Sequence, residues 1–412
     1  MADIKAFRAI RPQKGLENKI AALPYDVYNR QEAKTAVAGN PYSFLRIDRA
    51  ETQFPDTVDT YDDCVYAKAK ELFDEQIKKG AYITEETPCF YLYELIMDGR
   101  SQTGIVGCAS IDDYLNGVIK KHENTRADKE LDRIRHVDTL NAQTGSIFLA
   151  YRDREDLRTL VAQIMQNEPV YDFTAEDGIT HRVFVVEEKE AVSKIAGIFQ
   201  EMNQIYIADG HHRCASAVKV GLKRREENPG YDGSEEFNYF LSVLFPDSQL
   251  KIMDYNRVVK DLNGLSEAAF LQALTQIVTI EEKGTSPVTV TQKGEIGMFL
   301  ADKWYLLTVD ESKRPNDPVK GLDVSVLQDM ILNPLLGIEN PKTDKRIDFV
   351  GGIRGLKELE RRVHTDMKVA FAMYPTSINE LFAVADAGLL MPPKSTWFEP
   401  KLRSGLFIHN LI

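Results

Sequence analysis

Hydrophobic and polar positions alternate along this chain with two different periods. Over residues 59–79 the apolar side chains recur on one side among Asp, Lys and Glu, which is the pattern of an amphipathic helix. Residues 89–97 (CFYLYELIM) are rich in strand-forming side chains, and Asp98-Gly99 offers a hairpin turn before residues 102–111 continue as a second strand. This part of the chain therefore predicts a helix followed by a β-hairpin.

The middle of the chain repeats the alternation of strand and helix. Residues 145–151 (GSIFLAY) predict a short buried strand, and residues 153–166 and 188–203 show the helical period. The second of these helices leads into another apolar strand at residues 204–208 (QIYIA). A further helix is expected from Lys129 onward, after a polar loop. Such alternation is typical of an α/β (α+β) fold.

A polar stretch at residues 223–236 (KRREENPGYDGSEE) predicts a linker, and apolar strands near residues 239–246 and 286–309 follow it. We therefore expect three parts along the chain. The first is an N-terminal segment, residues 1–100, that packs on the core. The second is the core itself, residues 101–225. The third is a C-terminal α/β domain with a Pro-rich closing strap, residues 236–412.

Composition places the chain among ordinary folded proteins. It has 412 residues, 43% hydrophobic and 28% charged, and at about 150 residues per domain this length predicts two or three domains. No apolar run approaches the roughly 18 residues of a membrane helix. The first fifteen residues lack the apolar region of a secretory signal. We therefore expect a soluble cytoplasmic protein with no membrane partner.

Charge and cysteine spacing exclude two further classes of protein. The net charge of −12 argues against broad nucleic-acid binding. The four cysteines, Cys64, Cys89, Cys108 and Cys214, stand far apart and form no CxxC pair, which excludes a zinc ribbon and predicts reduced thiols. A homodimer is compatible with the sequence.

Several standard catalytic motifs are absent from the chain. It contains no GxxxxGK[ST], GxGxxG or GxSxG, so P-loop, Rossmann-fingerprint and α/β-hydrolase assignments have no anchor. His122-Glu123 begins like the helix of a zinc protease, but Arg126 stands where the second histidine ligand would be. The chemistry must therefore come from other clusters of residues.

The densest cluster of reactive side chains, Asp209-Gly210-His211-His212-Arg213, follows a predicted strand and opens a predicted helix. Asp209 or Gly210 would cap that helix, and its free N–H groups would point out of the turn. Gly210 permits a sharp turn and a close approach by a ligand. Two imidazoles and a guanidinium at a helix N-terminus are unfavourable unless an anion fills the turn. Arg213 could clamp such an anion through two of its oxygens.

This cluster predicts a turn that binds the phosphates of a nucleotide. The alternative is that Asp209 caps the helix while the two histidines pack or face solvent. A metal site made by His211 and His212 is disfavoured because neighbouring helix positions point about 100° apart.

The second cluster is KKHENTR at residues 120–126, where Glu123 stands among Lys, His and Arg side chains. A carboxylate surrounded by cations stays ionised and could accept a proton from a hydroxyl group. The cations, Arg126 among them, could equally hold an anionic substrate. A solvated run of charges before a helix explains the pattern just as well.

Two further stretches are rich in hydrogen-bonding side chains. Residues 135–145 (RHVDTLNAQTG) could line a binding loop or cap turns, and the candidate ligands there are Arg135, His136 and Thr144. Residues 391–401 (MPPKSTWFEPK) could offer Lys394 to an anion, or form a strap packed by their aromatic residues. The spacing alone does not choose between these alternatives.

Six motifs stand in order along the chain. They are YDV near residue 25, NPYSFLR at 40–46, HENT at 122–125, RIRHVDTLNAQTG at 133–145, IADGHHR at 207–213 and MPPKSTWFEPK at 391–401. Together they resemble the bacterial and archaeal DUF1015 family, and the resemblance spans essentially the whole chain. Membership of this family by itself implies no activity.

The turn carries a narrower resemblance. Asp209–Arg213 and the Ala-rich helix after it are similar to the nucleotide-binding signature of the ParB/sulfiredoxin superfamily. Its chromosome-partitioning members bind CTP at this place, whereas its free serine kinases carry DGHHR there and a catalytic glutamate in a His-Glu context. The resemblance implies a mixed-sheet ParB/sulfiredoxin-like core over residues 101–225, with ATP or ADP (or CTP) and Mg²⁺ as cofactors.

Carried onto this chain, the resemblance implies a role for Glu123 and for the Asp209–Arg213 turn, and the clusters described above supply the other candidate residues. Glu123 would activate the substrate hydroxyl, and His122 and Asp209 would join it as catalytic residues. The nucleotide phosphates would be bound by Gly210, His211, His212 and Arg213. The substrate would be bound by Arg126, Arg135, His136, Thr144 and Lys394. No metal ligand is assigned firmly, although Asp209 or Glu123 could bind Mg²⁺.

The leading hypothesis is a nucleotide-dependent phosphotransferase for a small hydroxy (amino) acid, with free L-serine or O-phosphoserine first. The sequence does not set the direction of transfer. The alternative is a non-enzymatic nucleotide switch that binds CTP or ATP, which the missing helix-turn-helix pattern weakens. A sulfiredoxin-like redox enzyme ranks last, because Cys214 stands one place beyond where its thiol is expected.

Overall fold

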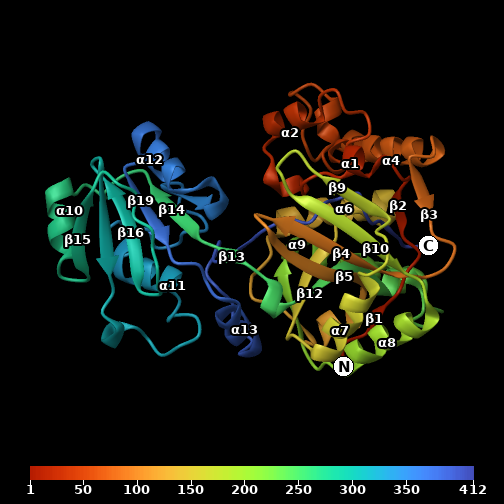
Figure 1. Cartoon of the computed structure of the whole chain (residues 1–412). Coiled ribbons are helices and arrows are strands. Elements are labelled where there is room, and N and C mark those ends of the chain that lie inside the picture. Colours follow the sequence, from red (N-terminus) through yellow and green to blue (C-terminus); the bar gives the residue numbers. More distant parts are fainter. The chain divides into compact units, whose positions relative to one another are not determined.

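A computed structural model describes residues 1–412, which divide into two compact units (Figure 1). The first unit contains Met1–Leu250 together with Pro400–Ile412, and the second contains Lys251–Glu399. The chain therefore leaves the first unit once and returns to it at its end. None of the helices has both the length and the apolar character that crossing a membrane requires.

A nine-stranded mixed sheet forms the centre of the first unit. Its strands are β1 Ile4–Lys5, β4 Phe90–Met97, β5 Arg100–Ser110, β6 Ile119–Lys120, β8 Ile147–Tyr151, β9 Tyr171–Thr174, β10 Thr180–Val186, β11 Ile205–Asp209 and β12 Tyr239–Pro246. They lie in the order β6-β11-β8-β12-β5-β4-β10-β9, with β1 beside β5. The pairs β6/β11 and β8/β12 are parallel, and the other pairs are antiparallel. This confirms the α/β (α+β) class with a mixed sheet, whereas the likeness to the ParB/sulfiredoxin core stays a prediction.

The hairpin of β4 and β5 forms where its turn signal stands in the sequence. Asp98 and Gly99 have φ angles of 52° and 76°, and Met97 pairs with Arg100 across them. Two central residues with positive φ match the right-handed twist of the flanking strands. The local sequence therefore sets the register of this pair of strands.

Nine helices belong to the first unit: α1 Glu17–Ile20, α2 Arg30–Val37, α3 Leu45–Asp48, α4 Asp63–Lys78, α5 Ile111–Leu115, α6 Ala127–Leu140, α7 Glu155–Ile164, α8 Lys189–Gln200 and α9 His211–Glu227. Helix α6 packs against α9 and against α4, and α7 packs against α8. Four short strands complete this unit: β2 Ile10–Pro12, β3 Tyr82–Thr84, β7 Ala142–Gln143 and β21 His409–Asn410. Strand β21 pairs with β7, so the end of the chain is held beside the start of β8.

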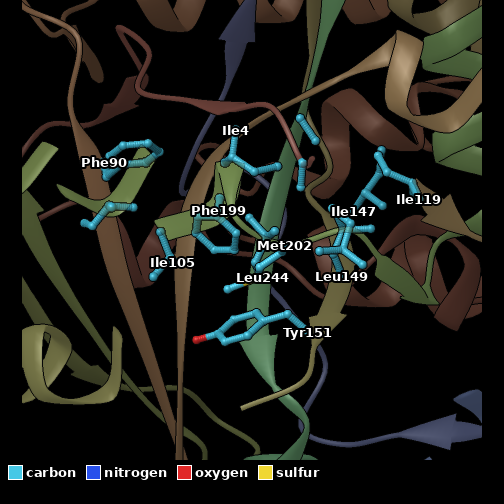
Figure 2. Packing of buried hydrophobic residues seen from close by; sticks show 14 of the residues in the cluster. Ile4, Phe90, Ile105, Ile119, Ile147, Leu149, Tyr151, Phe199, Met202 and Leu244 are labelled. Atoms are coloured by element: carbon cyan, nitrogen blue, oxygen red, sulfur yellow. The ribbon is translucent and has the colours of Figure 1, made fainter. Parts of the chain in front are cut away.

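A buried hydrophobic cluster holds the sheet against helix α8. Figure 2 shows Ile147 and Leu149 of β8 near Leu244 of β12, together with Phe199 at the end of helix α8 and Met202 just after it. Burying a side chain of this size contributes about 1.5–3 kcal/mol to folding. The same cluster contains β11 residues, and it therefore fixes the strand from whose end α9 begins.

The expected domain boundaries differ from the contacts in the structure. The boundary at residue 236 lies inside the first unit, because β12 pairs with both β5 and β8. Residues 223–236 are the end of α9 and a surface loop, and such a loop has the same composition as a linker. The expected N-terminal segment, residues 1–100, supplies β1 and β4 to the same sheet as the expected core.

The second unit is built on a six-stranded antiparallel sheet in the order β15-β17-β16-β19-β14-β18. The strands of the second unit are β13 Ile252–Met253, β14 Tyr255–Val259, β15 Thr279–Gly284, β16 Glu295–Leu300, β17 Lys303–Thr308, β18 Ile347–Gly351, β19 Val369–Met373 and β20 Trp397–Phe398. Strands β13 and β20 pair with each other outside the six-stranded sheet. Its helices are α10 Glu267–Leu274, α11 Asp323–Leu327, α12 Leu356–Thr365 and α13 Ile378–Asp386. Trp304 is buried in its core beside Phe299, within the region where strands were expected.

Candidate functional site

The turn between β11 and α9 is built around Gly210. This residue has a φ of 92° and occupies the N-cap position, and no side chain caps the helix. A Cβ atom at Gly210 would lie 3.1 Å from both Nε and Nη2 of Arg213. Glycine therefore allows the left-handed backbone and also lets the guanidinium fold over the turn. The first N–H groups of α9 have no acceptor within the helix and are oriented to bind an anion.

The carboxylate of Asp209 is held at the base of this turn. Its Oδ1 accepts the N–H of Gly210 at 2.7 Å, and its Oδ2 accepts a hydrogen bond from Nζ of Lys401 at 2.8 Å. Burial by itself would raise the pKa of Asp209, but the charges of Lys401 and Arg213 outweigh burial and hold this pKa below its usual range. Asp209 is therefore ionised at neutral pH.

Arg213 keeps hydrogen-bonding capacity for a ligand. Its Nη1 donates to the carbonyl of Ser146 at 2.6 Å, whereas its Nε and Nη2 donate to no protein acceptor. The guanidinium forms no salt bridge with a carboxylate. A planar fork with spare N–H groups can bind two oxygens of one phosphate.

The two histidines of the turn act as hydrogen-bond acceptors. Nε2 of His211 accepts the N–H of His122 at 3.5 Å, and Nε2 of His212 accepts the N–H of Arg126 at 3.0 Å. A ring nitrogen that accepts a hydrogen bond carries no proton, so both rings are neutral. Burial, with His122 close by, lowers the pKa of His211 well below its ordinary value. Of the three potential cations at this helix start, Arg213 carries the charge, and the two imidazoles accept hydrogen bonds from the loop.

These histidines hold the loop that carries Glu123. The loop connects β6 to α6, and β6 is parallel to β11 with Ile119 opposite Ile205. Because parallel neighbours end at the same edge of a sheet, the chain delivers residues 121–126 and the Asp209–Arg213 turn to one place. Glu123 is half-buried in this loop.

His122 packs the loop against α9. Its side chain is 1% exposed, its ring meets that of His211 edge-on at 4.4 Å, and neither ring nitrogen has a hydrogen-bond partner. Burial lowers the pKa of His122 to about 4, although the charge of Asp209 opposes this. His122 therefore packs the loop against the turn, and its expected catalytic role stays a prediction.

Two adjoining cavities of about 160 and 30 Å³ lie beside the turn. Both are lined by the same four side chains, Tyr25, Asp48, Arg133 and His136. The smaller cavity is also lined by Arg213 and Thr144, and Thr144 donates its hydroxyl to Oδ1 of Asp48 at 3.1 Å. The structure thus brings together the turn and two of the expected substrate ligands, His136 and Thr144.

Two other expected substrate ligands do not line these cavities. Arg126 is exposed and pairs with Asp128 through Nε and Nη2. Arg135 pairs with Asp63 near the start of α4. Arg133, rather than Arg135, lines the cavities. Arg133 and His136 are three residues apart and therefore share one face of α6.

The expected strap at residues 391–401 is divided between the two units. Lys394 lies in the second unit, with its Nζ 5.6 Å from the centre of the Tyr255 ring. Lys401 lies in the first unit and pairs with Asp209. The role of Lys394 as a substrate ligand stays a prediction.

Sequence reasoning missed four residues of the site. Tyr25 and Asp48 stand in or beside the turn-rich N-terminal motifs, and Lys401 stands at the end of the strap motif. The guanidinium of Arg133 stacks on the Tyr25 ring at 4.0 Å. The spacing of Arg133 from His136 was a usable signal, but the other contacts join residues far apart in the chain.

The structure bears on two further sequence-based expectations. Cys214 is fully buried in the core, and burial raises the pKa of its thiol, so it offers no reactive thiol for sulfiredoxin-like chemistry. No group of three or more His, Cys, Asp or Glu side chains could hold a metal ion. Magnesium at this turn would therefore take further oxygen ligands from phosphates and water.

The fold and the site define a mixed-sheet α/β protein with a glycine turn between a strand and a helix, over which an arginine with spare N–H groups folds. The chain belongs to the DUF1015 family, described as a protein of unknown function, whose family model matches residues 4–325. No curated protein sequence matches the chain.

Three solved structures are similar to this chain at low identity. A mutant free serine kinase in complex with ADP is 14% identical, with a TM-score of 0.35 over 74% of this chain and 92% of that one. SbnI from Staphylococcus aureus is 12% identical, with a TM-score of 0.38 over 71% and 82%. A conserved hypothetical protein from Pyrococcus furiosus is 15% identical, with a TM-score of 0.35 over 74% and 94%. These likenesses assign neither substrate nor reaction to this chain.

Proposed function

We propose that this protein is a nucleotide-dependent phosphotransferase that acts on a small hydroxy amino acid. The lead candidate substrates are L-serine and, in the reverse direction, O-phosphoserine. One observation carries the proposal. The imidazoles of His211 and His212 bind the backbone of the loop that holds Glu123, which supports a shared role for this loop and the turn. The DGHHR sequence of that turn resembles free serine kinases, which supports the same assignment.

The turn would bind the nucleotide phosphates through its backbone and Arg213. The free N–H groups at the start of α9 and the unpaired Nε and Nη2 of Arg213 would neutralise phosphate charge. The rings of His211 and His212 are occupied by the loop, so they would support the phosphate site through their backbone and through packing. Catalysis of phosphoryl transfer is largely positioning and charge stabilisation, which this arrangement supplies.

Glu123 would act as the general base. In the forward direction it accepts the proton of the substrate hydroxyl while that oxygen bonds to the γ-phosphorus of ATP, and the bond from this phosphorus to the β-phosphate oxygen breaks to release ADP. In the reverse direction, the phosphoryl group of O-phosphoserine passes to ADP and the serine oxygen regains its proton. Glu123 and Asp209 are the carboxylates that could bind Mg²⁺, which would neutralise phosphate charge when present.

The test is ³¹P NMR on the purified chain with Mg²⁺. One sample contains ATP and L-serine, another contains O-phosphoserine and ADP, and Arg213→Ala serves as the control in both. We expect the phosphoserine signal to grow or shrink in step with the nucleotide signals, and to stay constant with Arg213→Ala.

A constant phosphoserine signal in both samples, with nucleotide still bound to the wild-type protein, would overturn the proposal. That outcome would favour the alternative in which the turn binds CTP or ATP as a switch without transferring phosphate.

A further inference from the structure

The cavities beside the turn contain one carboxylate that lacks a counter-ion. Three carboxylates line the larger cavity: Asp48, Glu51 and Asp132. Glu51 pairs with Arg49 at 2.5 Å, and Asp132 pairs with Arg133 at 2.9 Å. Asp48 has no lysine or arginine within salt-bridge distance, and the nearest ring nitrogen, Nε2 of His136, is 3.8 Å from its Oδ1.

Asp48 is also incompletely hydrogen-bonded. It is 5% exposed, and its Oδ1 accepts the hydroxyl of Thr144. Its Oδ2 accepts from no donor in the chain, and His136 is neutral because burial lowers its pKa to about 4. A buried carboxylate without a cation or a full set of donors is unfavourable by itself. Arg133 is near enough for its charge to act on Asp48 but forms no salt bridge with it, so a ligand with a cationic group would supply the direct partner.

Arg133 offers the opposite charge on the same cavities. Its Nε and Nη2 are both bonded to Asp132, and its guanidinium stacks on Tyr25. Its Nη1 donates to no acceptor in the chain. Because Asp48 and Arg133 line both cavities, a small ligand there can contact an anion and a cation of the protein at once.

We propose that these cavities bind the substrate as a zwitterionic α-amino acid, with Asp48 receiving its ammonium group and Arg133 its carboxylate. This inference rests on the proposed function and assigns the two side chains that would recognise the amino acid. A cavity of about 150 Å³ can hold benzene, so the larger cavity, at about 160 Å³, has room for a small amino acid. Arg213 lines the smaller cavity, which places a side-chain hydroxyl next to the phosphate turn.

The test compares L-serine with D- and L-glycerate, which carry a hydroxyl in place of the amino group. Binding to the full chain is measured by isothermal titration calorimetry, with and without a non-hydrolysable ATP analogue. We expect the wild-type protein to bind L-serine and to bind either glycerate at least about 10-fold more weakly. Asp48→Asn should raise the Kd for L-serine about 10- to 100-fold, since it removes the charge and keeps the shape.

Asp56→Asn is the matched control, because Asp56 is a 70% exposed carboxylate in the same N-terminal region and lines neither cavity. It should bind L-serine as the wild-type protein does. Equal binding of L-serine and glycerate, or binding of neither under both conditions, would overturn the inference. If Asp48→Asn does not fold, the wild-type comparison of the ligands decides the question.

The calorimetry, together with a phosphoryl-transfer assay with ATP on the same ligands, separates this inference from the proposed function. Selective binding of L-serine without any phosphoryl transfer would leave the amino-acid site standing and would remove the phosphotransferase. Phosphoryl transfer to serine and glycerate with equal kcat/KM would support the phosphotransferase and contradict the amino-acid site.

Discussion

At the scale of single residues, buried neutral histidines position the loop that carries Glu123. His122 has no hydrogen-bond partner on either ring nitrogen, whereas His211 accepts a hydrogen bond from the loop backbone. Both are buried, and the cost of burying a charge exceeds the attraction of Asp209 for a protonated ring. The local arrangement therefore depends on these rings staying neutral.

This dependence predicts a loss of stability in mild acid. Burial lowers the pKa of His122 from 6.5 to about 4, so the folded chain binds fewer protons than the unfolded chain between these values. His122 therefore lowers the free energy of unfolding as the pH falls from 6.5 toward 4, by about 3 kcal/mol in all, and has no such effect above pH 6.5. His122→Phe should keep the packing and lose less stability between pH 7 and 4.5, which urea unfolding at a series of pH values measures. Identical pH profiles for the variant and the wild-type protein would contradict the assignment.

Local sequence predicted some residues of the site and could not predict others. Gly210 and Arg213 were found because a strand, a glycine and a helix start are neighbours in the chain. Asp48 and Lys401 were missed because each meets its partner across a long separation, Asp48 with Thr144 and Lys401 with Asp209. The histidines were found, but their contacts with the Glu123 loop were not, since those hydrogen-bond donors come from a distant part of the chain.

At the scale of elements, two parallel strands bring together the loop that carries Glu123 and the Asp209–Arg213 turn. Strands β6 and β11 end at one edge of the sheet, where the loop after β6 meets the start of α9. The hydrogen bond from the Arg126 N–H to His212 joins these elements. The loop is thus ordered by α9 as well as by its own ends.

Removal of the His212 ring should loosen this loop. His212→Ala removes the acceptor of the Arg126 N–H, and one hydrogen bond is worth about 1 kcal/mol. We expect amides in residues 121–127 to exchange about 5-fold faster in hydrogen–deuterium exchange. His364→Ala, at an exposed histidine of the second unit, is the control and should leave that peptide unchanged. Unchanged exchange with His212→Ala would show that the ring does not hold the loop.

Elements with strong local patterns were predicted well, and those without were missed. The sequence predicted β4, β5, α7 and α8 close to their observed bounds. Strand β15 was missed because it is an edge strand whose sequence, TIEEKG, is largely exposed. Its polar side chains provide none of the alternation that marks a half-buried strand.

Long-range strand order decides the site at the scale of the whole molecule. No local pattern indicates that β12 lies between β8 and β5, or that the chain end at Pro400–Ile412 returns to the first unit. These two features account for the misplaced boundary at residue 236 and for the missed Lys401. Family membership was predicted from the six motifs, and the family match confirms it.

The most direct test of the phosphotransferase is to separate nucleotide binding from turnover. Glu123→Gln and Arg213→Ala are compared with the wild-type protein by ATP titration and by formation of O-phosphoserine from ATP and L-serine. Glu123→Gln should bind ATP with nearly unchanged affinity and lose about 10²-fold or more in kcat. Arg213→Ala should lose affinity for ATP itself. Full turnover by Glu123→Gln would contradict the account, because the loop that the two histidines hold would then carry no catalytic base.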